Sequence, residues 1–218
     1  MAVNAEASRR RAVFVDKDGT LIENVPYNVD VTRIRFAPGA ERAVHRLAAA
    51  GFAIVVVSNQ AGVARGIFDE SAVAAVGRAL TERLAELGVA LDGFYYCPHD
   101  PHGVVARYRR ICDCRKPAPG LVLRAARELG LDLSASWLVG DILDDIEAGR
   151  RAGCRTILID AGNETEWRMS PARLPNHVAA DLGEAAGLIV ALDGALAGPT
   201  ADASQSPVER RKRTAPER

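Results

Sequence analysis

The sequence predicts a doubly wound, Rossmann-like α/β fold built on a parallel sheet. Short apolar runs rich in β-branched residues alternate along the chain with longer segments of helical pattern, which is typical of βαβ units. Three of the apolar runs end in polar or acidic residues, at 16–18, 58–59 and 141. Because parallel strands place their carboxyl ends at one edge of a sheet, we expect these residues to meet where open α/β sheets bind ligands.

The apolar runs have the length of buried strands, and the segments between them carry helix signals. The predicted strands are residues 12–15, 53–57, 93–96, 136–140, 156–159 and a short one near Val178. The helices begin at proline or at a capping side chain, and glycine follows several of them. The predicted helices are residues 38–50, 69–87, 119–129, 143–152 and 182–192. Residues 21–36 follow neither pattern clearly, and we expect a small flap there.

Length and composition predict one well-buried domain. The chain has 218 residues, of which 48% are hydrophobic and 26% charged, and it is too short for two large domains. We expect a flexible N-terminus over residues 1–10 and a single domain over residues 11–197. Residues 198–218 are polar and carry a basic cluster at 210–213, and we expect a disordered tail there.

The charge balance limits the classes of partner. A formal net charge of zero argues against a nucleic-acid partner. No apolar run approaches the ~20 residues of a membrane span, and residues 1–11 lack the apolar centre of a secretory signal. We therefore expect a cytoplasmic enzyme without membrane contact, and a monomer.

The acidic residues at the predicted sheet edge indicate a magnesium site. Asp16 and Asp18 follow the first strand, and Asp141 follows the fourth, with Asp144 and Asp145 close behind. Several acids in one crevice need a cation, and oxygen ligands with open positions suit Mg²⁺, which completes its shell with water and substrate phosphate. The pattern therefore points to phosphate chemistry. The alternative is a turn in which Asp18 and the following glycine only reverse the chain.

Three cysteines and a histidine predict a structural zinc site in a loop over residues 97–114. They form two close pairs, Cys97 with His99 and Cys112 with Cys114. Three thiolates and one imidazole are a donor set of closed tetrahedral zinc sites. The alternatives are reduced thiols or a disulfide, and a cytoplasmic location argues against the disulfide. His102 is a weaker candidate for the imidazole ligand, and Cys154, among apolar residues, is expected in the core.

Lys116 follows the last of the paired cysteines by two residues and precedes a predicted helix. A lysine there can supply positive charge to a bound phosphate without displacing the metal. A zinc site would fix the approach of Lys116. We therefore expect the zinc to have a structural role.

Four motifs in this order resemble those of the haloacid dehalogenase superfamily of aspartyl phosphotransferases, over about residues 12–160. The motifs are Asp16-Lys17-Asp18-Gly19-Thr20, Ser58, Lys116, and Gly140-Asp141 with Asp144 and Asp145. The resemblance implies that Asp16 is a nucleophile and that Asp18 acts as general acid and base. It also implies Mg²⁺ held by Asp16, the backbone carbonyl of Asp18 and Asp141. Ser58 and Lys116 would then hold the phosphate oxygens.

A closer resemblance is to the zinc-loop branch that contains the D-glycero-D-manno-heptose 1,7-bisphosphate 7-phosphatases and the histidinol phosphatases. Residues 58–66, 95–99 and 112–117 carry it. The intervals between motifs leave no room for a large cap domain, so a capless fold is expected. The resemblance implies substrate-binding roles for Asn24, Val25, Pro26, Tyr27, Asn59, Gln60, Ala61 and Arg115. An arginine suits the second phosphate because it can grip it with two parallel hydrogen bonds.

The activity implied is removal of the 7-phosphate of heptose 1,7-bisphosphate, a small phosphorylated sugar, in the synthesis of nucleotide-heptose precursors for lipopolysaccharide core or surface glycans. Histidinol phosphate is an alternative substrate, because the same signature and zinc loop occur in its phosphatases. A polynucleotide 3′-phosphatase would need a more basic surface. A further alternative is a non-catalytic, zinc-stabilised binding module, against which the intact Asp16, Asp18, Lys116 and Asp141 argue.

Overall fold

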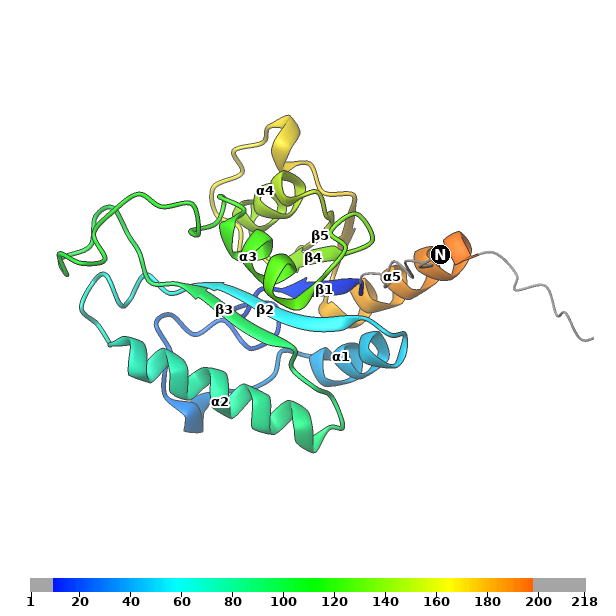
Figure 1. The fold of residues 1–218 in the computed structure, drawn as a ribbon, viewed down its shortest axis with the longest axis horizontal. Coiled ribbons are helices and arrows are strands. Elements are labelled where there is room, and N and C mark those ends of the chain that lie inside the picture. The colour runs from blue at the N-terminus through cyan, green and yellow to red at the C-terminus, as the bar shows by residue number, and fades with distance from the viewer. Residues whose placement is uncertain (1–9, 198–218) are drawn as a thin grey trace, which may run out of the picture.

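The computed structural model describes residues 10–197, which form a six-stranded sheet with helices on both faces (Figure 1). The strands are β1 (Ala12–Val15), β2 (Ala53–Asn59), β3 (Gly93–Cys97), β4 (Trp137–Gly140), β5 (Arg155–Ile159) and β6 (His177–Ala179). All pairs are parallel, in the order β3-β2-β1-β4-β5-β6. The chain adds β2 and β3 on one side of β1 and the later strands on the other. Where the strand order changes direction in this way, the connections that follow the two adjacent strands diverge. A crevice therefore forms at the carboxyl ends of β1 and β4.

The described residues also form five α-helices and two short 3₁₀ helices, all of which lie between strands except the last α-helix, which follows β6. The α-helices are α1 (Ala40–Ala49), α2 (Glu70–Glu86), α3 (Gly120–Leu129), α4 (Leu143–Ala152) and α5 (Leu182–Ala197), and the 3₁₀ helices are η1 (Val31–Arg33) and η2 (Pro171–Arg173). Helices α1, α2 and α5 cover one face of the sheet, and α3 and α4 cover the other (Figure 1). The doubly wound α/β fold predicted from the sequence is confirmed.

The start of α2 and the end of α3 carry the capping residues that the sequence indicates. The Asp69 side chain accepts a hydrogen bond from the backbone N–H of Ala72 at 3.1 Å and caps the start of α2. Gly130 ends α3 with φ 65°, a left-handed conformation that costs glycine less than other residues. Predicted and observed bounds agree within two residues, except that α5 continues to Ala197.

Both faces of the central strand are buried, as a doubly wound sheet requires. Val13 and Val15 pack into the core on the side of α1, α2 and α5, while Ala12 and Phe14 pack toward α3. All four side chains have no exposed surface. This packing holds the carboxyl end of β1 in a fixed position beneath the crevice.

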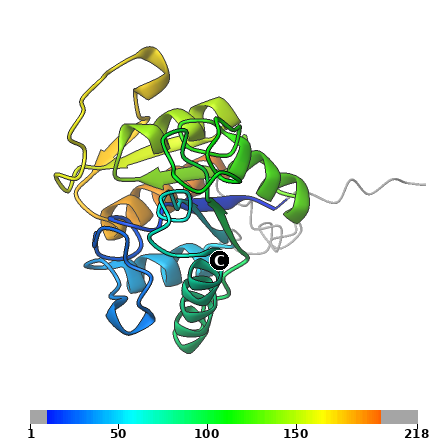
Figure 2. The same ribbon diagram turned by 90° about the vertical axis from the view of Figure 1, so that its left-hand side faces the viewer.

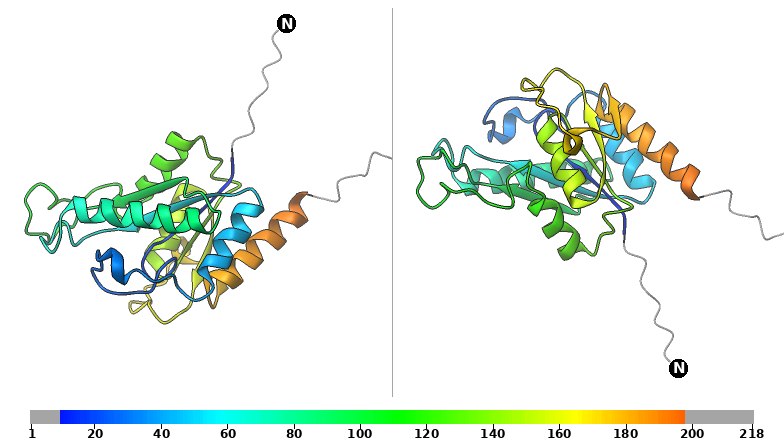
Figure 3. Two further views of the ribbon diagram at one scale, coloured as in Figure 1. Left: turned by 90° about the horizontal axis from the view of Figure 1, so that it is seen from below. Right: turned by 90° about the horizontal axis from the view of Figure 1, so that it is seen from above.

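Three connections extend from the carboxyl edge of the sheet, onto which Figure 2 looks. Residues 21–36 form the predicted flap, closed by a backbone bridge between Ile22 and Phe36. Residues 98–119 extend beyond β3 at one end of the molecule (Figure 3). Residues 160–176 run from β5 to β6 and contain η2; no structure was predicted for them, and they form the yellow excursion in Figure 2.

The predicted flexible segment 1–10, apart from Arg10, and the predicted tail 198–218 lie outside the described residues. Arg10 forms a backbone bridge with Leu131 and an ion pair with Asp92 at 2.9 Å. No helix within residues 10–197 has both the length and the apolar character needed to cross a membrane.

Candidate active site

Three carboxylates lie close together at the carboxyl ends of β1 and β4, where the strand order changes direction. Asp16 follows β1, Asp141 follows β4, and Asp145 lies in the first turn of α4. Their ligand atoms lie within 4.8 Å of one another, and all three residues are buried. The backbone N–H of Asp16 donates to the carbonyl of Val139 at 2.9 Å, which joins the two strand ends. The oxygen donors therefore converge as they do at sites for hard cations.

A buried lysine faces this carboxylate cluster. Lys116 Nζ contacts carboxylate oxygens of Asp16 and Asp145 and donates to the carbonyl of Val57 at 3.0 Å. Burial alone would lower the pKa of Lys116, but the charges of Asp145 and Asp16 outweigh burial and raise that pKa above its usual value. Lys116 therefore carries a positive charge at neutral pH beside the Asp16 carboxylate.

One positive charge does not balance three carboxylates. Burial, together with the charge of Asp16, raises the pKa of Asp141 to about 8. Burial also raises the pKa of Asp145 to about 7, against the opposing charge of Lys116. These shifts show that the protein alone compensates the charged forms poorly. A divalent cation among the converging oxygens would favour the charged forms, so the donor set fits Mg²⁺.

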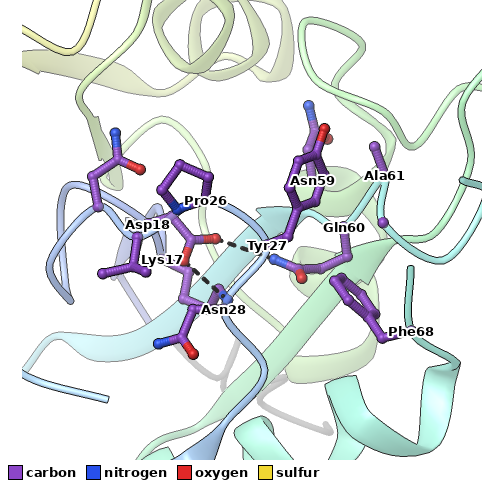
Figure 4. A pocket seen from close by; sticks show the side chains of 12 residues that line it. Lys17, Asp18, Pro26, Tyr27, Asn28, Asn59, Gln60, Ala61 and Phe68 are labelled. Carbon is purple, nitrogen blue, oxygen red and sulfur yellow. Dashed lines mark hydrogen bonds and ion pairs between the residues drawn. The ribbon is translucent and has the colours of Figure 1, made fainter. Parts of the chain in front are cut away.

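Asp18 faces a neighbouring cavity (Figure 4). Gln60 Nε2 donates to Asp18 Oδ2 at 3.2 Å, and Lys17 Nζ lies 3.0 Å from Asp18 Oδ1. The Lys17 contact is an ion pair without hydrogen-bond geometry, so Oδ1 accepts no hydrogen bond. Burial raises the pKa of Asp18, although the charge of Lys17 opposes this. A raised pKa favours the protonated carboxyl that a general acid needs.

The cavity beside Asp18 has a volume of about 280 Å³ and lies between the flap 21–36 and the loop that follows β2 (Figure 4). Its lining includes seven of the eight residues for which substrate binding was predicted: Asn24, Val25, Pro26, Tyr27, Asn59, Gln60 and Ala61. Arg115 is not in this lining, and its Nη1 donates to the backbone carbonyl of His99 at 3.3 Å. The structure thus brings most of the predicted substrate residues to one cavity next to the predicted acid.

The end of β2 connects the cavity with the carboxylate cluster. Ser58 is buried, and its Oγ accepts a hydrogen bond from Gln60 Nε2 at 2.8 Å. The Asn59 side chain exchanges two hydrogen bonds with the backbone of Lys116, donating to the carbonyl and accepting from the N–H, each at 3.0 Å. Asn59 therefore positions the backbone of Lys116 as well as lining the cavity.

The turn after β1 has a glycine because Asp141 approaches it closely. A Cβ atom on Gly19, whose φ is 89°, would lie 2.0 Å from Asp141 Oδ2. Thr20 Oγ1 donates to the other oxygen of Asp141 at 3.3 Å. The residues that follow Asp18 thus leave room for Asp141 and orient its carboxylate.

The four residues predicted to bind zinc lie together. The Sγ atoms of Cys97, Cys112 and Cys114 are 3.2–3.6 Å apart, and His99 Nδ1 is 3.3 Å from Cys114 Sγ and 3.6 Å from Cys97 Sγ. A tetrahedron with Zn–S bonds of ~2.3 Å has edges of ~3.7 Å, so the arrangement fits zinc. None of these thiols is in a disulfide. His102, the other imidazole considered, lies outside the cluster.

The thiols differ in their tendency to ionise. A hydrogen bond from Cys97 lowers the pKa of Cys114 to about 5, which favours the thiolate that zinc binds. Cys154 lies in the core, as predicted, and burial raises its pKa to about 12. Cys154 therefore has the properties of a structural core residue.

Two residues of the site had no assigned role in the sequence interpretation. The sequence shows Asp145 only as an acid near Asp141, whereas in the structure it contacts Lys116 from the first turn of α4. The four-residue spacing between the two acids, across a strand-to-helix turn, is the signal that could have identified it. Lys17 is only 1% exposed, but a lysine between two acids looks solvent-exposed in a sequence.

Comparisons with known proteins agree with this geometry. Residues 113–185 match the model of a family described as HAD-hydrolase-like. A D-glycero-beta-D-manno-heptose-1,7-bisphosphate 7-phosphatase of Photorhabdus laumondii is 43% identical over 152 residues, which are 69% of this chain and 81% of the relative. The protein of the same name from Escherichia coli K12 is 39% identical over 177 residues, 77% of this chain and 93% of the relative.

A solved structure extends the similarity to three dimensions. It is a D,D-heptose 1,7-bisphosphate phosphatase from B. bronchiseptica, complexed with magnesium and phosphate. It has 32% sequence identity and a TM-score of 0.69, and the match covers 84% of this chain and 99% of that one.

Proposed function

This chain belongs to the haloacid dehalogenase superfamily and, within it, to the family of the heptose bisphosphate phosphatases, and we propose that it removes the 7-phosphate of D-glycero-D-manno-heptose 1,7-bisphosphate. The observation that carries the proposal is the crevice in which Asp16 and Asp141 face Lys116, beside a cavity that holds Asp18. The product would enter synthesis of nucleotide-heptose precursors for lipopolysaccharide core or surface glycans.

Two carboxylates would carry the reaction. The Asp16 carboxylate attacks phosphorus, and the bond from phosphorus to the sugar oxygen breaks as Asp18 gives that oxygen a proton. Asp18 then takes a proton from water, which attacks the aspartyl phosphate, releases inorganic phosphate and restores Asp16. The burial that raises the pKa of Asp18 supports its first role, as acid.

Lys116 and Ser58 would hold the phosphate oxygens during both steps. Lys116 Nζ already contacts Asp16, so a phosphate that reaches the nucleophile also reaches this charge. Fixed donors in a buried site stabilise developing negative charge without reorganisation, which makes such positioning effective. When bound by Asp16, Asp141 and the backbone carbonyl of Asp18, magnesium would orient the phosphate and offset its repulsion from Asp16.

Zinc would have a structural role. Cys97, His99, Cys112 and Cys114 are its proposed ligands, and the last of them stands two residues before Lys116. The loop is also held from its other side, where the hydroxyls of Tyr96 and Tyr108 both donate to the Glu70 carboxylate. The zinc would therefore fix the backbone that delivers Lys116.

The remaining roles concern the sugar and its second phosphate. The cavity lined by Asn24 to Tyr27 and Asn59 to Ala61 would take the sugar. Arg115 would contact the second phosphate, because its guanidinium has five donors and the hydrogen bond to His99 uses one. We further propose a single domain over residues 11–197 that acts as a monomer in the cytoplasm, where free thiols persist for zinc.

Phosphate release in the presence of Mg²⁺ tests the proposal. The substrates are the two anomers of heptose 1,7-bisphosphate, histidinol phosphate and fructose 1,6-bisphosphate. We expect kcat/KM for a heptose bisphosphate to exceed that for the others by about a hundredfold, or ~3 kcal/mol of selective transition-state binding. Asp16→Asn should lower kcat at least about a thousandfold because it removes the nucleophile. Asp69→Asn is the matched control, since asparagine also caps a helix.

Two other outcomes have clear meanings. A preference for histidinol phosphate would keep the fold and chemistry but replace the substrate. Equal, very slow turnover by the wild type and Asp16→Asn would instead favour the non-catalytic binding module.

A further inference from the structure

The connection between β5 and β6 reaches the candidate active site. Residues 160–176 leave the carboxyl edge of the sheet on the same side of the molecule as the flap 21–36 (Figure 2). Two side chains join this connection to the site. Asn163 Oδ1 accepts a hydrogen bond from Asn24 Nδ2 at 3.1 Å, and Glu164 Oε2 accepts one from the backbone N–H of Leu143 at 2.7 Å. Asn163 is thus held beside Asn24, which lines the substrate cavity.

The amide group of Asn163 also lies close to the reaction centre. A Cβ atom on Gly19 would lie 2.7 Å from Asn163 Nδ2 and 2.0 Å from Asp141 Oδ2. Asn163 Nδ2 and Asp141 Oδ2 therefore both lie beside Gly19, in the turn after β1. No hydrogen bond donated by the Asn163 amide group is found among residues 10–197. The group is partly exposed and free to bind a ligand at a fixed position.

We propose that Asn163 donates a hydrogen bond to a sugar hydroxyl of the substrate and determines specificity; the inference rests on the function proposed above. An amide suits a hydroxyl because it both donates and accepts hydrogen bonds and carries no charge. Its oxygen is occupied by Asn24, which leaves the NH₂ group for the substrate.

The charges around Asn163 on the side away from Asn24 favour binding of a neutral substrate group over binding of a second phosphate. Asn163 lines a further cavity of about 310 Å³ with three acids, Asp144, Glu164 and Glu166. Two arginines are also in that lining, but both are paired. Arg173 pairs with Asp144 at 2.8 Å and with Glu147 at 2.7 Å, and Arg168 pairs with Glu166 at 3.3 Å, so the lining keeps one more acid than arginines. A dianionic phosphate would meet net repulsion there, whereas a hydroxyl would not.

The variant Asn163→Ala tests this role, with two substrates measured on the magnesium-loaded enzyme. We expect kcat/KM for heptose 1,7-bisphosphate to fall about tenfold, mainly through KM, because the hydroxyl loses its partner. With p-nitrophenyl phosphate, whose leaving group has no sugar hydroxyl, kcat/KM should change less than about twofold. Ser170→Ala, on the same connection and exposed, is the control and should change neither value.

A second variant separates direct contact from positioning. If Asn163 contacts the substrate itself, Asn163→Ala lowers kcat/KM for the bisphosphate again in an Asn24→Ala background. No further loss in that background would overturn the inference, because Asn163 would then act only by holding Asn24. An equal loss with both substrates, or no loss with either, would also overturn it. A wild type that prefers histidinol phosphate, which has no free hydroxyl, would refute the proposed function and this inference together.

Discussion

At the scale of residues, the buried lysine is the feature on which the site depends. Lys116 has almost no exposed surface and contacts Asp16 and Asp145, which are also buried. Removing one partner of a buried ion pair leaves an uncompensated charge, which costs more than the pair contributes. Lys116 therefore stabilises the folded protein as well as serving the proposed chemistry.

We expect Lys116→Met to lower the free energy of unfolding by about 3–5 kcal/mol in magnesium-free buffer, as measured by urea denaturation. Asp145→Asn in the same background should restore part of this loss, because it removes one of the unpaired carboxylates. If Lys116→Met were as stable as the wild type, the result would contradict the ion pairs of Lys116 with Asp16 and Asp145.

A second close contact occurs at Gly140, between the end of β4 and the start of α4. A Cβ atom there would lie 2.3 Å from the Asp145 carboxyl carbon, so the acid would have to move away from Lys116. We expect Gly140→Ala to destabilise the protein by about 2 kcal/mol or more and to reduce phosphate release. The same substitution at Gly194 of α5, where nothing lies within 4 Å, should be neutral or stabilising by up to ~1 kcal/mol. Equal effects at the two glycines would argue against the packing described.

At the scale of elements, the zinc-binding loop has the task of presenting Lys116. The connection from β3 to α3 is long and largely polar, with few apolar contacts to hold it. The cluster of three thiols and one imidazole joins its beginning to its end. A metal at this cluster would replace the packing that the loop lacks.

We expect one zinc per chain by elemental analysis, and none in Cys112→Ser. Loss of zinc should increase protease cleavage within residues 98–113 and lower kcat/KM, because the backbone before Lys116 becomes mobile. Cys154→Ala is the matched control: it removes a thiol from the core and should retain full zinc content. Unchanged zinc content in Cys112→Ser would exclude it as a ligand.

At the scale of the whole molecule, the central strand makes the described residues one cooperative unit. β1 pairs with β2 on one side and β4 on the other, and its side chains enter the cores of both faces. The crevice lies at the end of this strand, so neither half of the sheet can open without disturbing the site.

We therefore expect one unfolding transition. Trp137 is fully buried on β4, whereas Trp167 is 54% exposed, so Trp167→Phe leaves one buried fluorescent reporter. Its fluorescence change in urea should coincide with the loss of far-UV circular dichroism. A fluorescence transition well before the loss of helix would show that β4 and β5 unfold separately.

The motifs and the order of elements could be predicted from the sequence alone, whereas most of the residues that line the cavity were named only through the resemblance to a known family. Asp16, Asp18, Gly19 and Thr20 occupy one strand end and its turn, so short-range chain geometry is enough to place them together. The same holds for each pair of zinc ligands. Strand and helix bounds followed from apolar periodicity and capping residues, which also act over short distances.

The sequence predicts that the strand ends meet at one edge of the sheet, but only the tertiary structure decided which distant side chains are in contact there. Lys116 lies 100 residues from Asp16, and Asn24 lies 139 residues from Asn163. Their contacts depend on how the strands are ordered and where each loop packs. Residues 160–176 have almost no regular structure, so no periodicity could place them. The sequence by itself determined the chemistry available at the end of each strand, and packing determined which groups share the crevice, because side chains distant in sequence are brought together only by the whole fold.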